Sequence, residues 1–306
     1  MHPDGDAIGS MIGLGLALRD MGKNVAVIAS QPLLPSYHFL PGSEMVSTPE
    51  GVHGKRFDCG IVLDCTSLDR LPEEVGKLFD QCETLINIDH HVSNAFFGAV
   101  NIVDSSASAT AEILYQVLSA LEIGISPDVA TNLYTALVTD TGSFRYQNTT
   151  HRCHLVASLL LEHGADHNKV QQRLNEQRTL ASIRLLQKGL STLVLDREGQ
   201  IAWMTISRLF CLETGCQMEE SEDYINYPKS IAGVEIAILF KEIDDHEVRV
   251  GFRSKNFADV DALAGRFGGG GHIRAAGCTV KGTLQEVEAL VIDAARGYLQ
   301  KKREVS

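Results

Sequence analysis

The chain has 306 residues, 44 % hydrophobic and 22 % charged, which is typical of a globular protein long enough for two domains. Its net charge of −12 argues against long duplex nucleic acid as a partner, because such binding depends largely on neutralising phosphates. We expect no membrane span and no secretory leader, and the seven scattered cysteines, without a Cys-x-x-Cys pair, favour reduced thiols and a cytoplasmic location.

The first half of the chain alternates strand-like apolar runs with helical patterns. Strands are predicted over Asn24–Ala29, Cys59–Asp64 and Leu85–Asp89. Apolar residues at helical spacing predict helices over Ile8–Met21, Leu71–Gln81, Ser108–Leu121 and Pro127–Val138. This alternation predicts an α/β domain over residues 1–150, with helices on both faces of a parallel sheet and ligands at the carboxyl ends of its strands.

The second half of the chain has a different pattern. A polar helical stretch over residues 151–189 predicts a connector, and residues 190–306 predict a smaller α+β domain. The strands of this domain are expected over Leu190–Leu195, Ile201–Ser207, Val234–Ile243 and Val248–Phe252. Its helices are expected over Asp259–Phe267 and Leu284–Leu299.

Carboxylates and imidazoles follow several strand-like runs of the first half. The Asp-His-His triplet after Leu85–Ile88 is the most informative, because such groups at the end of a buried strand are costly unless they bind something. Each group alone is also typical of a helix cap or a solvated loop. Together, in one α/β half, they favour a dinuclear metal site. The candidates are Asp4, Asp6, Asp64, Asp89, His90, His91 and Asp140.

Two divalent cations held about 3.5–4 Å apart need a bridging group and terminal ligands on each side. Carboxylates and imidazoles suit hard or borderline ions such as Mn²⁺ or Mg²⁺. Asp64 can bridge the ions, and a water between them becomes a hydroxide that attacks phosphorus. A metal or His91 can stabilise the charge of the leaving oxygen. The expected metal ligands are Asp4, Asp6, Asp64, His90 and Asp140.

The motifs of the chain resemble those of the DHH phosphoesterase superfamily. Four motifs resemble those of its first domain: PDGDAIGS, DHHVSN, SASATAE and TDTGSFRY. Two more resemble the DHH-associated C-terminal domain: GFRS and FGGGGHIRAAG. The group most similar to the chain is the short oligoribonuclease (nanoRNase) and 3′-phosphoadenosine-5′-phosphate (pAp) phosphatase type, whose core is similar to RecJ. This resemblance implies a homodimer with two Mn²⁺ ions, replaceable by Mg²⁺ or Co²⁺, that hydrolyses short oligoribonucleotides and 3′,5′-nucleoside bisphosphates.

The same resemblance implies roles for the metal candidates. The five expected ligands match the ligand positions of the family, Asp89 orients a ligand histidine, and His91 lies near the scissile phosphate. The first motif of the family, H-x-x-P-D-x-D, would place its histidine before Met1, and His2 is two residues too late. We therefore expect this polypeptide to bind the first metal weakly.

A glycine run, Gly268–Gly271, is the second informative feature. The N–H groups of consecutive glycines can approach an anion closely, and arginines can add charge-assisted hydrogen bonds. A flexible loop is the alternative interpretation, whereas the family resemblance implies that this segment binds the terminal phosphate or nucleotide end of a short substrate. The expected substrate-binding residues are Arg253, Ser254, Gly269, Gly270, Gly271, His272 and Arg274.

The SASATAE motif, Ser106–Glu112, has two interpretations of equal weight. Its hydroxyls and carboxylate are typical of a helix cap, and they are equally suited to supporting a neighbouring metal site. Three other functions also stay open for the chain as a whole. These are a cyclic- or linear-dinucleotide phosphodiesterase, a manganese pyrophosphatase and a non-catalytic nucleotide sensor.

Overall fold

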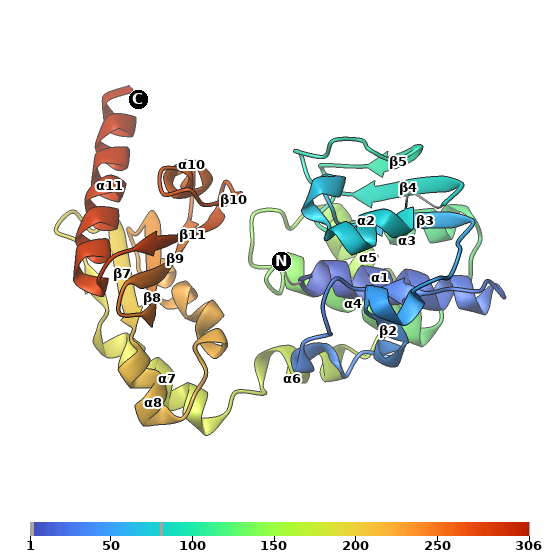
Figure 1. Ribbon diagram of the computed structural model, residues 1–306, viewed down its shortest axis with the longest axis horizontal. Coiled ribbons are helices and arrows are strands. Elements are labelled where there is room, and N and C mark those ends of the chain that lie inside the picture. The colour runs from blue at the N-terminus through green and yellow to red at the C-terminus, as the bar shows by residue number, and fades with distance from the viewer. Residues whose placement is uncertain (1–2, 80–81, 306) are drawn as a thin grey trace. The chain divides into compact units, whose positions relative to one another are not determined.

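The computed structural model describes residues 3–79 and 82–305, so His2 lies outside the described residues (Figure 1). The chain divides into two compact units, Met1–Gln177 and Arg178–Ser306. This division falls inside the stretch 151–189 that the sequence predicts as a connector. The division into 1–150, 151–189 and 190–306 therefore stays a prediction.

The first unit contains a parallel three-stranded sheet. Its order is β3 (Cys59–Leu63), β4 (Thr84–Asp89), β5 (Val100–Val103), and a separate parallel pair joins β1 (Val27–Ile28) to β2 (Val46–Ser47). The helices are α1 (Gly5–Asp20), α2 (Glu73–Phe79), α3 (Thr110–Ala120), α4 (Pro127–Asp140), α5 (His151–Glu162) and α6 (His167–Asn175). Short 3₁₀ helices cover Pro35–Tyr37, Ser43–Met45, Pro49–Val52 and Leu68–Arg70. The predicted α/β class with a parallel sheet is confirmed.

Not every predicted metal candidate follows a strand. Asp4 is the N-cap of α1, Asp6 lies in the first turn of that helix, and Asp140 is the last residue of α4. The expectation that these carboxylates end strands was wrong. Helix α4 continues through Asp140 because nothing interrupts it before Gly142, which has a left-handed backbone (φ 56°).

The packing of α1 against α4 depends on glycine. A Cβ at Gly9 would lie 2.5 Å from the Asn132 carbonyl oxygen, and a Cβ at Gly5 would lie 2.5 Å from the Thr139 side chain. Because close-packed interiors do not accommodate such contacts, only glycine allows the two helices to approach this closely. The first turn of α1 thereby lies beside the C-terminal end of α4.

The second unit contains a six-stranded mixed sheet in the order β10-β11-β9-β8-β7-β6. Only the β7–β8 pair in this sheet is parallel. The strands are β6 (Val194–Leu195), β7 (Ile201–Ile206), β8 (Ile236–Asp244), β9 (Glu247–Ser254), β10 (Gly270–His272) and β11 (Ala275–Lys281). The helices are α7 (Leu180–Ser191), α8 (Arg208–Thr214), α9 (Asn226–Ser230), α10 (Val260–Gly265) and α11 (Leu284–Val305), with a 3₁₀ segment over Met218–Ile225.

Two predictions in this unit were wrong in part. The strand expected over Leu190–Leu195 is reduced to its last two residues, because α7 continues to Ser191. Part of the expected glycine loop is strand β10, which pairs with β11, a strand that the sequence did not predict. Among the described residues, no helix combines the length and apolar character needed to cross a membrane.

Candidate metal centre

Three carboxylates surround the His90 imidazole at the carboxyl end of β4. The Nε2 atom of His90 lies 3.8 Å from Asp6 Oδ2 and 3.6 Å from both Asp64 Oδ1 and Asp140 Oδ2. Helices α1 and α4 thus each contribute one carboxylate, and strand β3 is followed by the third. The sequence predicted all four residues as metal ligands, and the structure brings them together.

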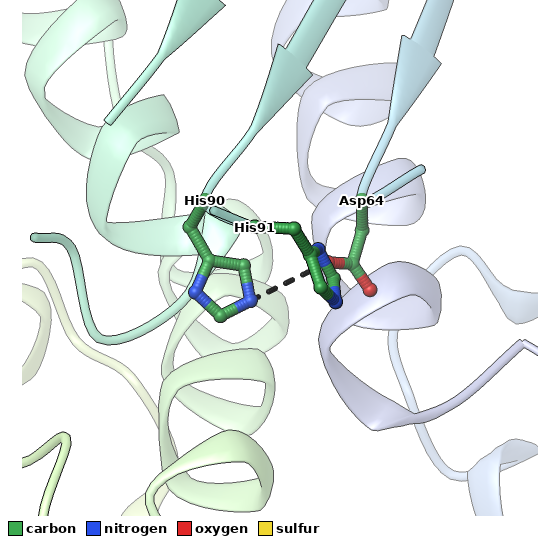
Figure 2. A group of neighbouring side chains, drawn as sticks. All are labelled: Asp64, His90 and His91. Carbon is green, nitrogen blue, oxygen red and sulfur yellow. Dashed lines mark ion pairs between the residues drawn. The ribbon is translucent and has the colours of Figure 1, made fainter. Parts of the chain in front are cut away.

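His91 also contacts Asp64, with its Nδ1 atom 3.5 Å from the same Oδ1 atom that His90 approaches. Figure 2 shows both histidines and Asp64 converging from the ends of neighbouring strands. Two groups of possible ligand atoms result, Asp64–His90–His91 and Asp6–His90–Asp140, each within 4.8 Å. His90 belongs to both groups, so the two groups adjoin at its imidazole, which can bind one cation through Nε2 because Nδ1 faces the Ala107 carbonyl.

Asp4, the fifth predicted ligand, belongs to neither of these two groups. Its side chain caps α1 by accepting the Ala7 N–H at 3.0 Å. The negative charge of Asp4 still acts on the centre, because it helps to raise the pKa values of Asp6 and Asp64. Direct coordination by Asp4 stays a prediction.

The position of Asp64 depends on its backbone. It follows β3 in the left-handed region (φ 54°), which aspartate tolerates better than most residues. Its N–H still donates to the Ile88 carbonyl at 3.0 Å, so the residue remains tied to β4. The turn therefore fixes the carboxylate beside the two histidines that follow β4.

Asp89 holds His91 in place. Its fully buried carboxylate accepts from His91 Nδ1 at 2.6 Å, from Asn94 Nδ2 at 2.6 Å and from the His90 N–H at 2.8 Å. Burial alone would raise the pKa of Asp89, but the hydrogen bonds from His91 and Asn94 outweigh it and lower that pKa. Burial would lower the pKa of His91, and the Asp89 hydrogen bond reverses this and raises it. The sequence predicted that Asp89 orients a ligand histidine. The imidazole that its carboxylate contacts is that of His91.

Backbone and hydroxyl groups at the start of α3 hold the other candidate ligands. The N–H groups of Thr110 and Ala111 donate to the two Asp6 oxygens at 2.7 and 3.3 Å. The Thr110 hydroxyl donates to Asp64 Oδ1 at 3.2 Å, and the Ala107 carbonyl lies 3.3 Å from His90 Nδ1. These contacts fix the orientation of ligand side chains, as outer groups of metal sites do.

Asn148 holds Asp140 and was missed by the sequence reasoning. Its Nδ2 atom donates to Asp140 Oδ2 at 3.3 Å and to the Ser108 carbonyl at 3.0 Å. Its Oδ1 atom is buried without a hydrogen-bond partner in the described structure. No sequence signal marked Asn148, because its role depends on contacts between residues 40 positions apart.

The carboxylates crowd each other in a buried site. Burial and the charges of Asp140 and Asp4 raise the pKa of Asp6, and burial with the charges of Asp6 and Asp4 raises that of Asp64. Burial raises the pKa of Asp140 to about 6, against the opposing charge of His90. Bound cations would relieve this repulsion, and the mixed carboxylate–imidazole donor set suits hard or borderline divalent ions. The residues therefore fit a divalent metal centre.

Comparison with known proteins identifies the family. Residues 1–138 match the DHH family N-terminal domain, and residues 201–301 match the DHHA1 domain. A bifunctional oligoribonuclease and PAP phosphatase of Thermus thermophilus is 31 % identical over 98 % of this chain and 88 % of its own length. The chain belongs to the DHH family. The family resemblance predicted from the motifs is confirmed.

Other relatives agree with the DHH assignment. A Bacillus subtilis protein with the same name is 28 % identical over 92 % of this chain and 87 % of its own length. The crystal structure of an exopolyphosphatase-related protein from Bacteroides fragilis superposes with a TM-score of 0.89 at 25 % identity, covering 99 % of this chain and 91 % of that one. The chain and this exopolyphosphatase-related protein therefore share a fold along nearly the whole chain.

The predicted substrate residues lie in the DHHA1 domain, where several contact main-chain carbonyls. Arg274 donates from Nη1 to the Ala258 carbonyl at 2.7 Å and from Nη2 to the Asn256 carbonyl. The buried Ser254 hydroxyl donates to the same Ala258 carbonyl at 2.6 Å, and Arg253 Nη1 donates to the Phe252 carbonyl at 2.9 Å. The side chains of Arg274 and Ser254 thus hold the loop after β9, and their contact with substrate stays a prediction.

Glycines in β10 and directly before it also have a packing role. A Cβ at Gly269 would lie 2.2 Å from the Gly277 carbonyl oxygen, and one at Gly271 would lie 2.5 Å from that of Ala275. The Gly271 N–H donates to Asp261 Oδ1 at 2.7 Å, while Gly270 and His272 are exposed. The close approach of β10 to β11 therefore accounts for these two glycines without a ligand.

Proposed function

We propose that this DHH protein is a metal-dependent phosphoesterase that hydrolyses short oligoribonucleotides and pAp. The observation that carries the proposal is the convergence of carboxylates and imidazoles in the groups Asp6–His90–Asp140 and Asp64–His90–His91. The curated relatives, named oligoribonuclease and PAP phosphatase, support the choice of substrates.

We assign a separate role to each candidate residue at this centre. Two divalent cations, when bound, neutralise phosphate charge and make a water acidic near neutral pH. Asp6, Asp140 and His90 would hold one cation, and Asp64 would be a ligand for the second. His91, whose ring Asp89 holds in one orientation, is suited to contact the scissile phosphate and stabilise the leaving oxygen.

The proposal also covers the metal ion, the substrate-binding segment, the location and the oligomeric state. We propose Mn²⁺ as the resident ion, with Mg²⁺ or Co²⁺ as substitutes, because the donors combine carboxylates with imidazoles. The DHHA1 segment with Arg253, Gly270 and His272 would bind the substrate end. We also propose a cytoplasmic homodimer, and the seven free cysteines are compatible with a reducing compartment.

A substrate comparison tests the proposal. The purified chain with Mn²⁺ is given an RNA dinucleotide, pAp, a cyclic dinucleotide and pyrophosphate in parallel, and released products are measured. We expect turnover of the RNA dinucleotide and pAp only. Turnover of pyrophosphate alone would favour a pyrophosphatase. Preferential turnover of the cyclic dinucleotide would favour a cyclic-dinucleotide phosphodiesterase. Binding of nucleotides without any hydrolysis would favour the sensor.

A further inference from the structure

The segment of residues 107–111 joins the two halves of the metal centre. Its main-chain groups hold Asp6 and His90, and its Thr110 hydroxyl holds Asp64. Most of this segment precedes α3 and has no regular secondary structure of its own. Its conformation must therefore be fixed by contacts outside the metal centre.

Glu112 supplies the first of these contacts. Its carboxylate is fully buried in the first turn of α3, and Oε2 accepts the Ser108 N–H at 3.0 Å. The carboxylate thus holds the backbone in the middle of the segment. A buried carboxylate is strongly destabilising without a cationic partner.

Arg152 on α5 provides that cation. Its Nε atom donates to Glu112 Oε1, and its Nη2 atom donates to Asp104 Oδ2 at 2.8 Å. One guanidinium thereby contacts acidic residues on both sides of the 107–111 segment. An arginine suits this role better than a lysine, because its planar group can donate in two directions from fixed positions.

A second contact joins the same two regions. The Ser108 hydroxyl donates to the Asn148 carbonyl at 2.5 Å, and Asn148 Nδ2 donates back to the Ser108 carbonyl. The same Nδ2 group contacts Asp140. The start of α5 and the 107–111 segment are therefore tied together at a point that also reaches the fourth candidate ligand.

We propose that the Glu112–Arg152 ion pair is a positioning device that fixes residues 107–111 and thereby sets the cation affinity of the metal centre. This inference rests on the metal dependence in the proposed function. Neither Glu112 nor Arg152 belongs to the two ligand groups. Both are positioning residues, and their effect on the cations passes through Asp6, Asp64 and His90.

Mn²⁺ titration of the full chain, followed by the electron paramagnetic resonance signal of free Mn²⁺, tests the proposal. Arg152→Met keeps the length of the side chain and removes its hydrogen bonds, and we expect it to weaken Mn²⁺ binding at least tenfold. Val75→Ala is the control, because Val75 is a buried residue of α2 that lies outside the core cluster containing Ala107, Ala109 and Ala111. It should lower the melting temperature and leave Mn²⁺ affinity unchanged.

Glu112→Gln provides an independent variant if Arg152→Met does not fold. It keeps an oxygen that can accept the Ser108 N–H but loses the ion pair, and we expect Mn²⁺ binding to weaken at least threefold. Parent-like Mn²⁺ affinity in the folded variants would overturn the inference, as would a parent chain that binds no Mn²⁺. A parent chain that binds Mn²⁺ but hydrolyses neither an RNA dinucleotide nor pAp would count against the proposed function alone.

Discussion

At the scale of single residues, Asp64 combines a backbone role with a chemical one. Its left-handed conformation ends β3 and turns the carboxylate toward His90 and His91. Aspartate and asparagine adopt this conformation readily, whereas most other residues are destabilised in it by about 1–2 kcal/mol. A substitution that tests the chemistry should therefore preserve the backbone preference.

Asp64→Asn meets this requirement. We expect it to lower kcat for pAp by about 100-fold or more, because the proposed metal centre would lose a carboxylate ligand while the side-chain shape is kept. The melting temperature of the metal-free variant should equal or exceed that of the parent, since one buried negative charge is removed. Steady-state kinetics and thermal unfolding measure the two effects. Asp20→Asn, at the exposed end of α1, should behave like the parent, and retained activity in Asp64→Asn would contradict its assigned role.

At the scale of elements, the sequence predicted strands β3 and β4 to within one residue and helices α1 to α4 to within about three residues at each end. Apolar periodicity carries this information, and it also located Asp64, His90 and His91 after their strands. It did not place Asp140 correctly, because the apolar run before it continues a helix. Asn148 and Arg152 could not be predicted, since their roles depend on contacts with residues about 40 positions away.

The contact between α1 and α4 gives a second prediction. Gly9→Ala should lower the free energy of unfolding by about 1–3 kcal/mol, because its Cβ would meet the main chain of Asn132. Mn²⁺ affinity should fall as well, since Asp6 lies one turn before Gly9 on the same helix. Chemical denaturation and Mn²⁺ titration measure these changes.

Gly76→Ala is the matched control for this substitution. Gly76 lies in α2, and a Cβ there has open space around it. We expect stability to rise by about 0.5–1 kcal/mol, as for alanine replacing glycine inside a helix, with Mn²⁺ binding unchanged. Equal stability of the Gly9 and Gly76 variants would refute the packing argument.

At the scale of the whole molecule, the metal centre makes stability depend on pH and on cations. The pKa of Asp140 is about 6 in the folded chain against an ordinary 3.8, so the folded state binds more protons between these values. Stability without metal therefore falls as the pH rises through this window. Above it, the charged form of Asp140 adds to the repulsion within the buried site, which a bound cation would relieve.

Calorimetry of the chain after chelation tests this dependence. The metal-free protein should have a higher melting temperature at pH 5 than at pH 7.5. Mn²⁺ at 100 times its Kd should stabilise the protein at pH 7.5 by about 2.7 kcal/mol, and the gain should shrink at pH 5 because protons compete for the ligands. A melting temperature that responds to neither chelation nor pH would contradict the charge-crowding argument.

The wide spacing of the candidate ligands along the sequence determines when the metal centre can form during protein synthesis. Asp6 and Asp140 lie far apart in the sequence, and residues between them provide Asp64 and the two histidines. A ribosome adding about 5–20 residues per second takes roughly 7–27 s to pass from Asp6 to Asp140. Throughout that interval the nascent chain has only part of the ligand set. The complete set of candidate ligands is therefore available only after the polypeptide through α4 has emerged.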